Sequence, residues 1–174
     1  MSEPSKDGHG YAIAAPHARE EERLEALKAT GLLDSAPQQR FDRLTELAKG
    51  TFDVETAVIS LVDADRQWFL STCGLDAKET SRDVAFCAHT IHEDDYLVVE
   101  DASNDPRFKG NPLVTSGPYI RFYAGAVLRN PEGLPLGTLC LLDPSPRSMS
   151  LQELNTLRTM VRLVEGEIFQ VDND

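Results

Sequence analysis

The sequence predicts an α+β domain built on an antiparallel β-sheet. Two pairs of apolar, β-prone runs are each joined by a short polar turn, which is the pattern of a β-hairpin. The longer helical patterns lie toward the two ends of the chain. The 174 residues suit one domain, long enough to bury roughly 70% of the surface of the unfolded chain.

The chain is predicted to begin with a mobile tail over residues 1–16, which are rich in Gly, Ser, Pro, Lys and Asp and show no apolar periodicity. One ordered domain is expected over residues 17–171. Good helix formers predict its first helix from Ala18 to about Thr30, ended by Gly31.

A second helix is predicted after Ser35, because Ser35 and Gln38 have the spacing of a helix-capping pair. Its apolar residues recur at helical spacing, so it should lie on the core and end near Gly50; they are Phe41, Leu44, Leu47 and Ala48.

Two hairpins are predicted to form the interior of the sheet. The first joins residues 56–62 to residues 67–73, and the second spans Tyr119 to Asp143 across a Pro/Gly-containing turn. Residues 56–62 and 134–142 are apolar on both faces, which an exposed strand would not tolerate. The sheet is therefore expected to be covered on both sides.

The middle of the chain is predicted to be rich in loops. Residues 74–83 are irregular and charged, residues 84–92 suit two turns of helix, and residues 97–100 form a short strand. Residues 101–118 contain too many Gly, Pro, Asn and Asp residues for a regular element. A long loop inside a domain is more often functional than idle, so this one is a candidate lid.

The last predicted helix opens with a capping box at Ser150–Glu153 and has the clearest periodicity in the chain. Its apolar residues form a heptad-like seam. One interpretation is a core helix lying on the sheet, and the other is a helix that also packs against a second copy, with help from Leu24 and Leu27. The seam residues are Leu154, Leu157, Val161, Val164, Ile168 and Val171.

Composition excludes several classes of partner. The formal net charge is −12 and the pI is near 4.7, which argues against nucleic acid and anionic membranes because phosphate binding needs a basic face. The sequence has neither an apolar run of 18 residues nor an apolar N-terminus, so no membrane span and no secretory signal are expected. Three cysteines at irregular spacing suit reduced thiols in the cytoplasm.

Nine short motifs in this order of elements resemble a GAF domain, of the kind found in bacterial sensor histidine kinases and diguanylate cyclases. The resemblance covers residues 20–169. It implies a GAF/PAS-like central antiparallel sheet of five or six strands, with terminal helices on one face and a small-molecule pocket under loops and short helices on the other. The motifs are Leu32–Asp34, Phe41–Leu44, Ser60–Asp63, Arg66–Phe69, Phe86–His89, Asp105–Phe108, Asn111–Val114, Ile120–Gly125 and Leu136–Cys140.

This resemblance implies a cytoplasmic sensory module of signal transduction. We expect it to bind an unidentified small molecule, to form a homodimer through its terminal helices and to regulate a kinase or cyclase output partner. No catalytic activity of its own, no metal and no particular cofactor is expected. Another possibility is a GAF domain that has lost its ligand and serves only for dimerisation.

An alternative function is thiol-dependent reduction of free methionine sulfoxide, which some GAF proteins perform with cysteines beside the pocket. Cys87 lies in the loop-rich middle, as that activity requires. Cys73 and Cys140 fall in predicted strands, where an apolar thiol is more often part of the core.

Arg121 and Tyr123 are the first candidates for ligand binding because they share one face of a predicted strand. A guanidinium there could pair with a carboxylate or phosphate, while the tyrosine supplies a flat wall and a hydroxyl. The alternative for Arg121 is an internal salt bridge to an acid of the loop, such as Asp101 or Asp105. Asp101 is included among the candidates.

Cys87, His89 and Trp68 complete the set of candidate ligand-binding residues. Cys87, His89 and His92 sit at spacings of two and three, so on one short helix they would point in different directions and a metal site is not expected. A lowered thiol pKa is not expected either, because acidic residues follow this segment. Trp68, the one tryptophan in the chain, is expected in the core or at the edge of the pocket.

Overall fold

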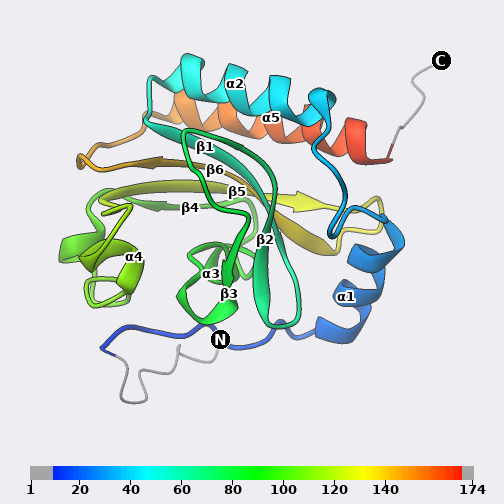
Figure 1. Cartoon of the computed structure of the whole chain (residues 1–174), viewed down its shortest axis with the longest axis horizontal. Helices are drawn as coiled ribbons and strands as arrows, with labels where there is room; N and C mark the ends of the chain where they lie inside the picture. The colour runs from blue at the N-terminus through cyan, green and yellow to red at the C-terminus, as the bar shows by residue number, and fades with distance from the viewer. Residues whose placement is uncertain (1–9, 170–174) are drawn as a thin grey trace.

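A six-stranded antiparallel sheet forms the middle layer of the computed structural model, which describes residues 10–169 (Figure 1). The strand order is β3-β2-β1-β6-β5-β4. The predicted fold class and strand number are therefore confirmed. The strands are β1 (Thr56–Val62), β2 (Arg66–Cys73), β3 (Glu79–Ser81), β4 (Tyr96–Val99), β5 (Phe122–Arg129) and β6 (Pro135–Asp143).

The β5–β6 hairpin lies inside the sheet, between β4 and β1, as its apolar faces predict. Side chains alternate along β5. Phe122, Ala124, Ala126 and Leu128 belong to the core on one side of the sheet, and Tyr123 belongs to the core on the other.

Helices α2 (Gln39–Phe52) and α5 (Leu151–Phe169) lie side by side over one face of the sheet (Figure 1). The capping box of α5 forms as predicted, because Glu153 N donates to Ser150 Oγ at 3.1 Å and Ser150 N donates to Glu153 Oε1 at 3.0 Å. Much of the heptad-like seam is used in the core, where Leu157, Val161 and Val164 are buried. Val171 lies outside the described residues.

The predicted bounds of α2 are wrong at both ends. Ser35 does not cap it, because its side chain contacts Gln38 Nε2 at 3.4 Å and the helix begins at Gln39. The helix continues through Gly50 and is ended by Asp53, which adopts a left-handed conformation with a φ of 50°.

Short elements cover the other face of the sheet, and several differ from expectation. Strand β3 was not predicted, because its Glu, Thr and Ser side chains lack the apolar alternation of a strand. The helix expected at residues 84–92 is a 3-10 turn, η1 (Arg82–Val84), followed by the single turn α3 (Cys87–Thr90).

The 101–118 loop also contains two single turns that were not predicted, η2 (Ala102–Asn104) and α4 (Pro112–Thr115). Each is capped by the acid or amide before it. Asp101 Oδ1 accepts from Ser103 N at 3.0 Å, and Asn111 Oδ1 accepts from Leu113 N at 2.9 Å.

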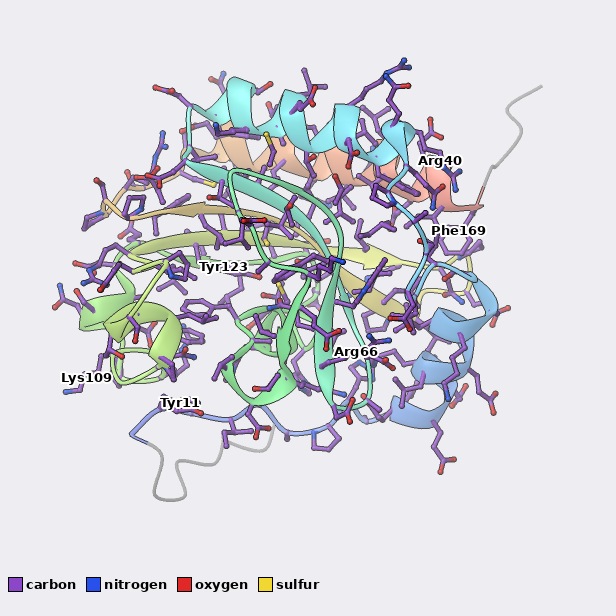
Figure 2. All side chains as sticks on the ribbon, viewed as in Figure 1. Tyr11, Arg40, Arg66, Lys109, Tyr123 and Phe169 are labelled. Atoms are coloured by element: carbon purple, nitrogen blue, oxygen red, sulfur yellow. The ribbon has the colours of Figure 1, made fainter. Side chains whose placement is uncertain are left out.

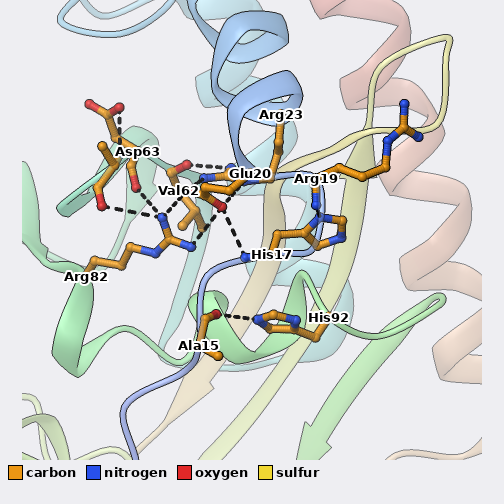
Figure 3. A network of polar contacts seen from close by, with 10 residues as sticks. Ala15, His17, Arg19, Glu20, Arg23, Val62, Asp63, Arg82 and His92 are labelled. Atoms are coloured by element: carbon orange, nitrogen blue, oxygen red, sulfur yellow. Dashed lines mark hydrogen bonds and ion pairs between the residues drawn. The ribbon is translucent and has the colours of Figure 1, made fainter. Parts of the chain in front are cut away.

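Helix α1 (Glu20–Ala29) lies at one end of the sheet and is attached there by a buried arginine (Figure 3). Arg23 is fully buried, and its Nη1 donates to the carbonyl of Val62, the last residue of β1, at 2.6 Å. The Glu20 carboxylate pairs with both Arg23 and Arg82. Burial raises the pKa of Glu20, but hydrogen bonds from the two guanidinium groups outweigh this and lower it to about 2.

Residues 10–16, expected to belong to a mobile tail, run under α3 in Figure 1 and make specific contacts. Tyr11 and Ala12 are buried, and Ala12 N donates to Arg107 O at 2.8 Å. His92 Nε2 lies 2.7 Å from Ala15 O. The composition of residues 10–16 gives no signal of these backbone contacts. The rest of the predicted tail, residues 1–9, lies outside the described residues. Within residues 10–169, no helix has the length and apolar character needed to cross a membrane.

Candidate ligand cavity

A cavity of about 210 Å³ lies between the sheet and the layer that contains α3. Its floor comes from β1, β2, β5 and β6, and its walls come from α3 and from the loop that follows α4. Apolar side chains dominate the lining, and the described lining residues include no Asp, Glu, Lys, Arg or His. They are Val58, Gln67, Phe69, Leu75, Ala77, Thr80, Phe86, Cys87, Leu113, Gly117, Pro118, Ile120, Tyr123, Cys140 and Leu142.

The strand register places Tyr123, Cys140 and Val58 on the cavity face of the sheet. Cys140 of β6 pairs with Val58 of β1 on one side and with Gly125 of β5 on the other. Tyr123 stands two residues before Gly125 on the same face, and its ring extends over that glycine. Figure 2 shows Tyr123 in the layer between the sheet and α3.

The Cys87 sulfur is the centre of a buried polar cluster beside the cavity. Its Sγ lies 3.0 Å from Thr138 Oγ1 and 4.0 Å from Cys140 Sγ, and the Tyr123 hydroxyl donates to it at 3.4 Å. The same Tyr123 hydroxyl lies 2.6 Å from Thr90 Oγ1. Sequence-distant parts of the chain thus converge on one thiol.

This cluster shifts the pKa values of the Cys87 and Cys140 thiols in opposite directions. Burial raises the pKa of Cys87, but hydrogen bonds from Cys140, Thr138 and Tyr123 outweigh it and lower that pKa to about 7. The hydrogen bond with Cys87, together with burial, raises the pKa of Cys140. Burial and the neighbouring thiols raise the pKa of Tyr123. The proton of the pair therefore stays on Cys140 while Cys87 ionises first.

A second polar chain runs from Ser60, beside Cys87, to the cavity lining. Ser60 Oγ donates to Gln67 Oε1 at 2.9 Å, and Gln67 Nε2 donates to Thr80 Oγ1 at 3.0 Å. Gln67 and Thr80 both line the cavity. These neutral groups, together with the Tyr123 hydroxyl, are the polar partners that an occupant would meet.

Two of the six predicted site residues, Cys87 and Tyr123, line the cavity together. Arg121 does not reach it, because its Nη1 donates to the backbone carbonyls of Val114 at 2.9 Å and Ile120 at 3.1 Å. The guanidinium thus stabilises the segment after α4 through hydrogen bonds to its backbone, and it does not pair with Asp101 or Asp105.

The other three predicted residues also lie away from the cavity. Asp101 caps η2, and its carboxylate accepts from Ser103 and Asn104. His89 is buried against the Phe108 ring, and its Nε2 lies 3.3 Å from Ala12 O. Trp68 belongs to the core on the α2 and α5 side of the sheet. Binding roles for these residues remain untested predictions.

Sequence reasoning missed Cys140, Thr138 and Gln67. Cys140 and Thr138 were hidden in an apolar strand, where residues of both faces look alike. The signal that could have found them is strand pairing, since the face of Tyr123 on β5 continues onto alternate residues of β6. Within residues 10–169, no group of three or more metal-ligating side chains converges.

The sequence from residue 36 to residue 168 matches the family model described as "GAF domain". This chain belongs to the GAF domain family. The match covers both faces of the sheet and every strand that lines the cavity, so the predicted family is confirmed.

A curated relative of this GAF domain is a cyclic di-GMP phosphodiesterase of Pseudomonas aeruginosa, 39% identical over 155 residues. The match covers 88% of this chain but 26% of the relative, so the chain spans about a quarter of that protein's length.

Solved structures share the fold at low identity. The GAF domain of an Acinetobacter phosphoenolpyruvate-protein phosphotransferase has a TM-score of 0.62 and 16% identity, covering 86% of this chain and 94% of that one. A free methionine-R-sulfoxide reductase from Neisseria meningitidis has a TM-score of 0.61 and 16% identity, covering 93% and 96%.

These comparisons correct the expectation that the chain has no catalytic activity of its own. The curated relative that matches most of this GAF domain is named as an enzyme, and the fold also occurs in a reductase. The sequence could not reveal this, because a GAF domain's own motifs describe its fold and not the protein that contains it.

Proposed function

We propose that this chain is a sensory GAF domain that binds a small, neutral and largely apolar molecule and regulates an output enzyme. The observation that carries the proposal is the cavity of about 210 Å³ beside Cys87 and Tyr123. An apolar lining with a few convergent polar groups is the usual form of a small-molecule site.

The size of the cavity favours a small ligand. Its volume lies below the roughly 300–1,000 Å³ of typical drug-sized sites and closer to the roughly 150 Å³ of an apolar cavity that holds benzene. A single aromatic ring or a molecule of similar size is therefore the expected occupant.

The charge of the cavity favours a neutral ligand. An ionised group that leaves water without an ion partner loses several kcal/mol of solvation. The described lining residues include no Lys, Arg or His, and an ionised Cys87 adds only a negative charge, so the phosphates of a cyclic nucleotide or the carboxylate of methionine sulfoxide would lack a cationic partner there. The Tyr123 hydroxyl and the Gln67 amide can instead bind a neutral polar atom.

We propose that the output enzyme hydrolyses cyclic di-GMP in the cytoplasm. The 39% identity to a cyclic di-GMP phosphodiesterase over 88% of the chain supports this choice over a kinase or cyclase. Coupling would pass through the sheet, because β1, β5 and β6 line the cavity on one face and contact α2 or α5 on the other. A ligand that moves these strands would also move the helices.

Thermal unfolding with matched probes tests the ligand class. We expect indole to raise the melting temperature and the anion indole-3-carboxylate to have no effect. Leu142→Trp should fill the cavity and abolish the indole effect, whereas Leu151→Trp at the exposed start of α5 should retain it. Equal stabilisation by the anion, or an indole effect that survives Leu142→Trp, would contradict the proposal.

A domain exchange tests the proposed output. The chain replaces the matching segment of the Pseudomonas phosphodiesterase, and hydrolysis of cyclic di-GMP is measured with and without indole. We expect a change in rate that Leu142→Trp removes and Leu151→Trp keeps. If indole stabilises the domain but the rate does not change, the binding proposal stands and the regulatory one fails.

The predicted homodimer remains part of this proposal. Leu47 of α2 and Leu163 of α5 are each 49% exposed on helices that cover the same face of the sheet. Exposed leucines on a paired helical surface favour self-association. We expect native mass spectrometry to detect a dimer that the double variant Leu47→Glu/Leu163→Glu converts to a monomer, and a wild-type monomer would contradict this.

A further inference from the structure

Two cysteine thiols meet at the edge of the cavity, although they are 53 residues apart in the sequence. Cys87 comes from α3 and Cys140 from β6, and their sulfur atoms are 4.0 Å apart. Both side chains are nearly inaccessible from the outer surface, yet both line the cavity. A small molecule that enters the cavity therefore lies against both cysteine residues.

The surroundings give the two sulfurs different chemical roles. The Tyr123 hydroxyl donates to the Cys87 sulfur, the Thr138 hydroxyl lies within hydrogen-bonding distance of it, and hydroxyl donors of this kind stabilise a thiolate. The thiolate is the form of cysteine that attacks electrophiles. Cys140 stays a thiol beside it, which is the arrangement of an attacking and a resolving cysteine.

We propose that Cys87 and Cys140 are an oxidation site that reacts with small hydroperoxides and closes to a reversible disulfide in the wall of the cavity. The inference does not depend on the identity of a cavity ligand or on the proposed output enzyme. Hydrogen peroxide and short alkyl hydroperoxides are neutral and small enough for a cavity of about 210 Å³ whose described lining has no Lys, Arg, His, Asp or Glu.

In the first step, the Cys87 thiolate attacks the terminal oxygen of the hydroperoxide. A sulfur–oxygen bond forms, the oxygen–oxygen bond breaks, and Cys87 becomes a sulfenic acid. The leaving oxygen takes up a proton from solvent and departs as water or an alcohol. The hydroperoxide is thereby reduced by two electrons.

In the second step, the sulfur of Cys140 attacks the sulfur of Cys87. The sulfur–sulfur bond forms, the sulfur–oxygen bond breaks, and the Cys140 proton leaves with the hydroxyl group as water. Closing the pair from 4.0 Å to the roughly 2.05 Å of a disulfide requires the sulfurs to approach by about 2 Å. That movement draws Cys87 from Thr138 and Tyr123 and reshapes the cavity wall.

Peptide mapping of the whole chain tests the proposal without any substitution. Trypsin places the three cysteines in three different peptides, residues 67–78 for Cys73, residues 83–107 for Cys87 and residues 130–147 for Cys140. The folded protein is treated with hydrogen peroxide, the remaining thiols are alkylated under denaturing conditions, and the digest is analysed by mass spectrometry.

We expect the 83–107 and 130–147 peptides to be recovered as one disulfide-linked species that dithiothreitol separates. The half-buried Cys73 does not line the cavity, so Cys73→Ser should leave the link intact. Cys140→Ser should replace the link with a sulfenic acid on Cys87 that dimedone captures. Indole, where it occupies the cavity, should slow the oxidation.

Two results would overturn the proposal in the wild-type protein alone. In one, both cavity cysteines stay reduced under peroxide that fully oxidises N-acetylcysteine in the same tube. In the other, Cys87 or Cys140 gains oxygen or links to Cys73 without forming the expected pair. Neither result depends on whether a variant folds.

Discussion

The hydroxyl of Tyr123 occupies the space over Gly125 that a side chain at residue 125 would fill. Both residues lie on the cavity face of β5, two positions apart. The absence of a side chain at Gly125 lets the tyrosine ring lie along the strand and place its hydroxyl beside Thr90 and Cys87. A glycine in an interior strand, usually a cost to stability, here makes room for the polar cluster.

Gly125→Ala should therefore destabilise the protein and disturb the cluster. The added methyl group would overlap the buried Tyr123 hydroxyl, and overpacking of this kind costs about 1–3 kcal/mol. Urea unfolding measures the change. Gly50→Ala is the matched control, because no atom lies near a methyl group there and the change should stabilise α2 by about 0.5–1 kcal/mol. Equal effects of the two substitutions would contradict this explanation.

Tyr123→Phe should raise the pKa of Cys87. The substitution removes one hydrogen-bond donor to the sulfur and keeps the ring, so the thiolate loses stabilisation. The rate of iodoacetamide alkylation of Cys87 against pH should rise with a midpoint at about 7 in the wild type and at higher pH in the variant. Thr138→Val should shift the midpoint in the same direction. A midpoint that neither substitution moves would show that these hydroxyls do not set the pKa.

The sequence predicted the parts of the fold that depend on local pattern. A β-prone run that is apolar on both faces located β1 to the residue, and the Ser150 capping box located the start of α5. Prediction failed where a contact from elsewhere in the chain decides the structure. Strand β3 exists because residues 79–81 pair with β2, and their own side chains carry no strand signal.

The site was harder to predict than the fold for the same reason. Arg121 and Tyr123 looked equivalent on one strand face, yet Arg121 precedes the first residue of β5 and its guanidinium turns to backbone carbonyls. Cys87 and Cys140 become neighbours through the packing of α3 on β6, which no spacing in the sequence encodes. When both faces of a strand are apolar, its sequence does not indicate which face borders a cavity.

His89 should make the protein less stable as the pH falls below 6.5. Burial lowers its pKa from 6.5 to about 4, with Arg107 and His92 adding to this and the Ala12 carbonyl and Asp105 opposing it. Between these values the unfolded chain binds a proton that the folded protein does not, so the free energy of unfolding decreases with falling pH.

The His89 contribution can be isolated with His89→Gln, whose amide can still donate to Ala12 O. Urea unfolding at pH 7 and pH 4 should show a loss for the wild type that exceeds the loss for the variant by about 3 kcal/mol. The two proteins share the other acidic groups, which cancel in this difference. Parallel stability curves would mean that His89 titrates normally or is exposed at low pH.

Arg23→Met should destabilise the protein much more than Arg19→Met does at the exposed start of α1. The substitution leaves the buried Val62 carbonyl without its guanidinium donor and removes one partner of Glu20. Breaking such a buried pair costs about 3–5 kcal/mol, and Arg82 still pairs with Glu20, so we expect a loss of about 2–4 kcal/mol in urea unfolding. Arg19→Met is the control, because the Arg19–Glu22 pair is exposed and screened by solvent, so its loss should change the stability little. If both substitutions cost the same, α1 is held by its apolar contacts and the buried arginine has no special part in attaching it.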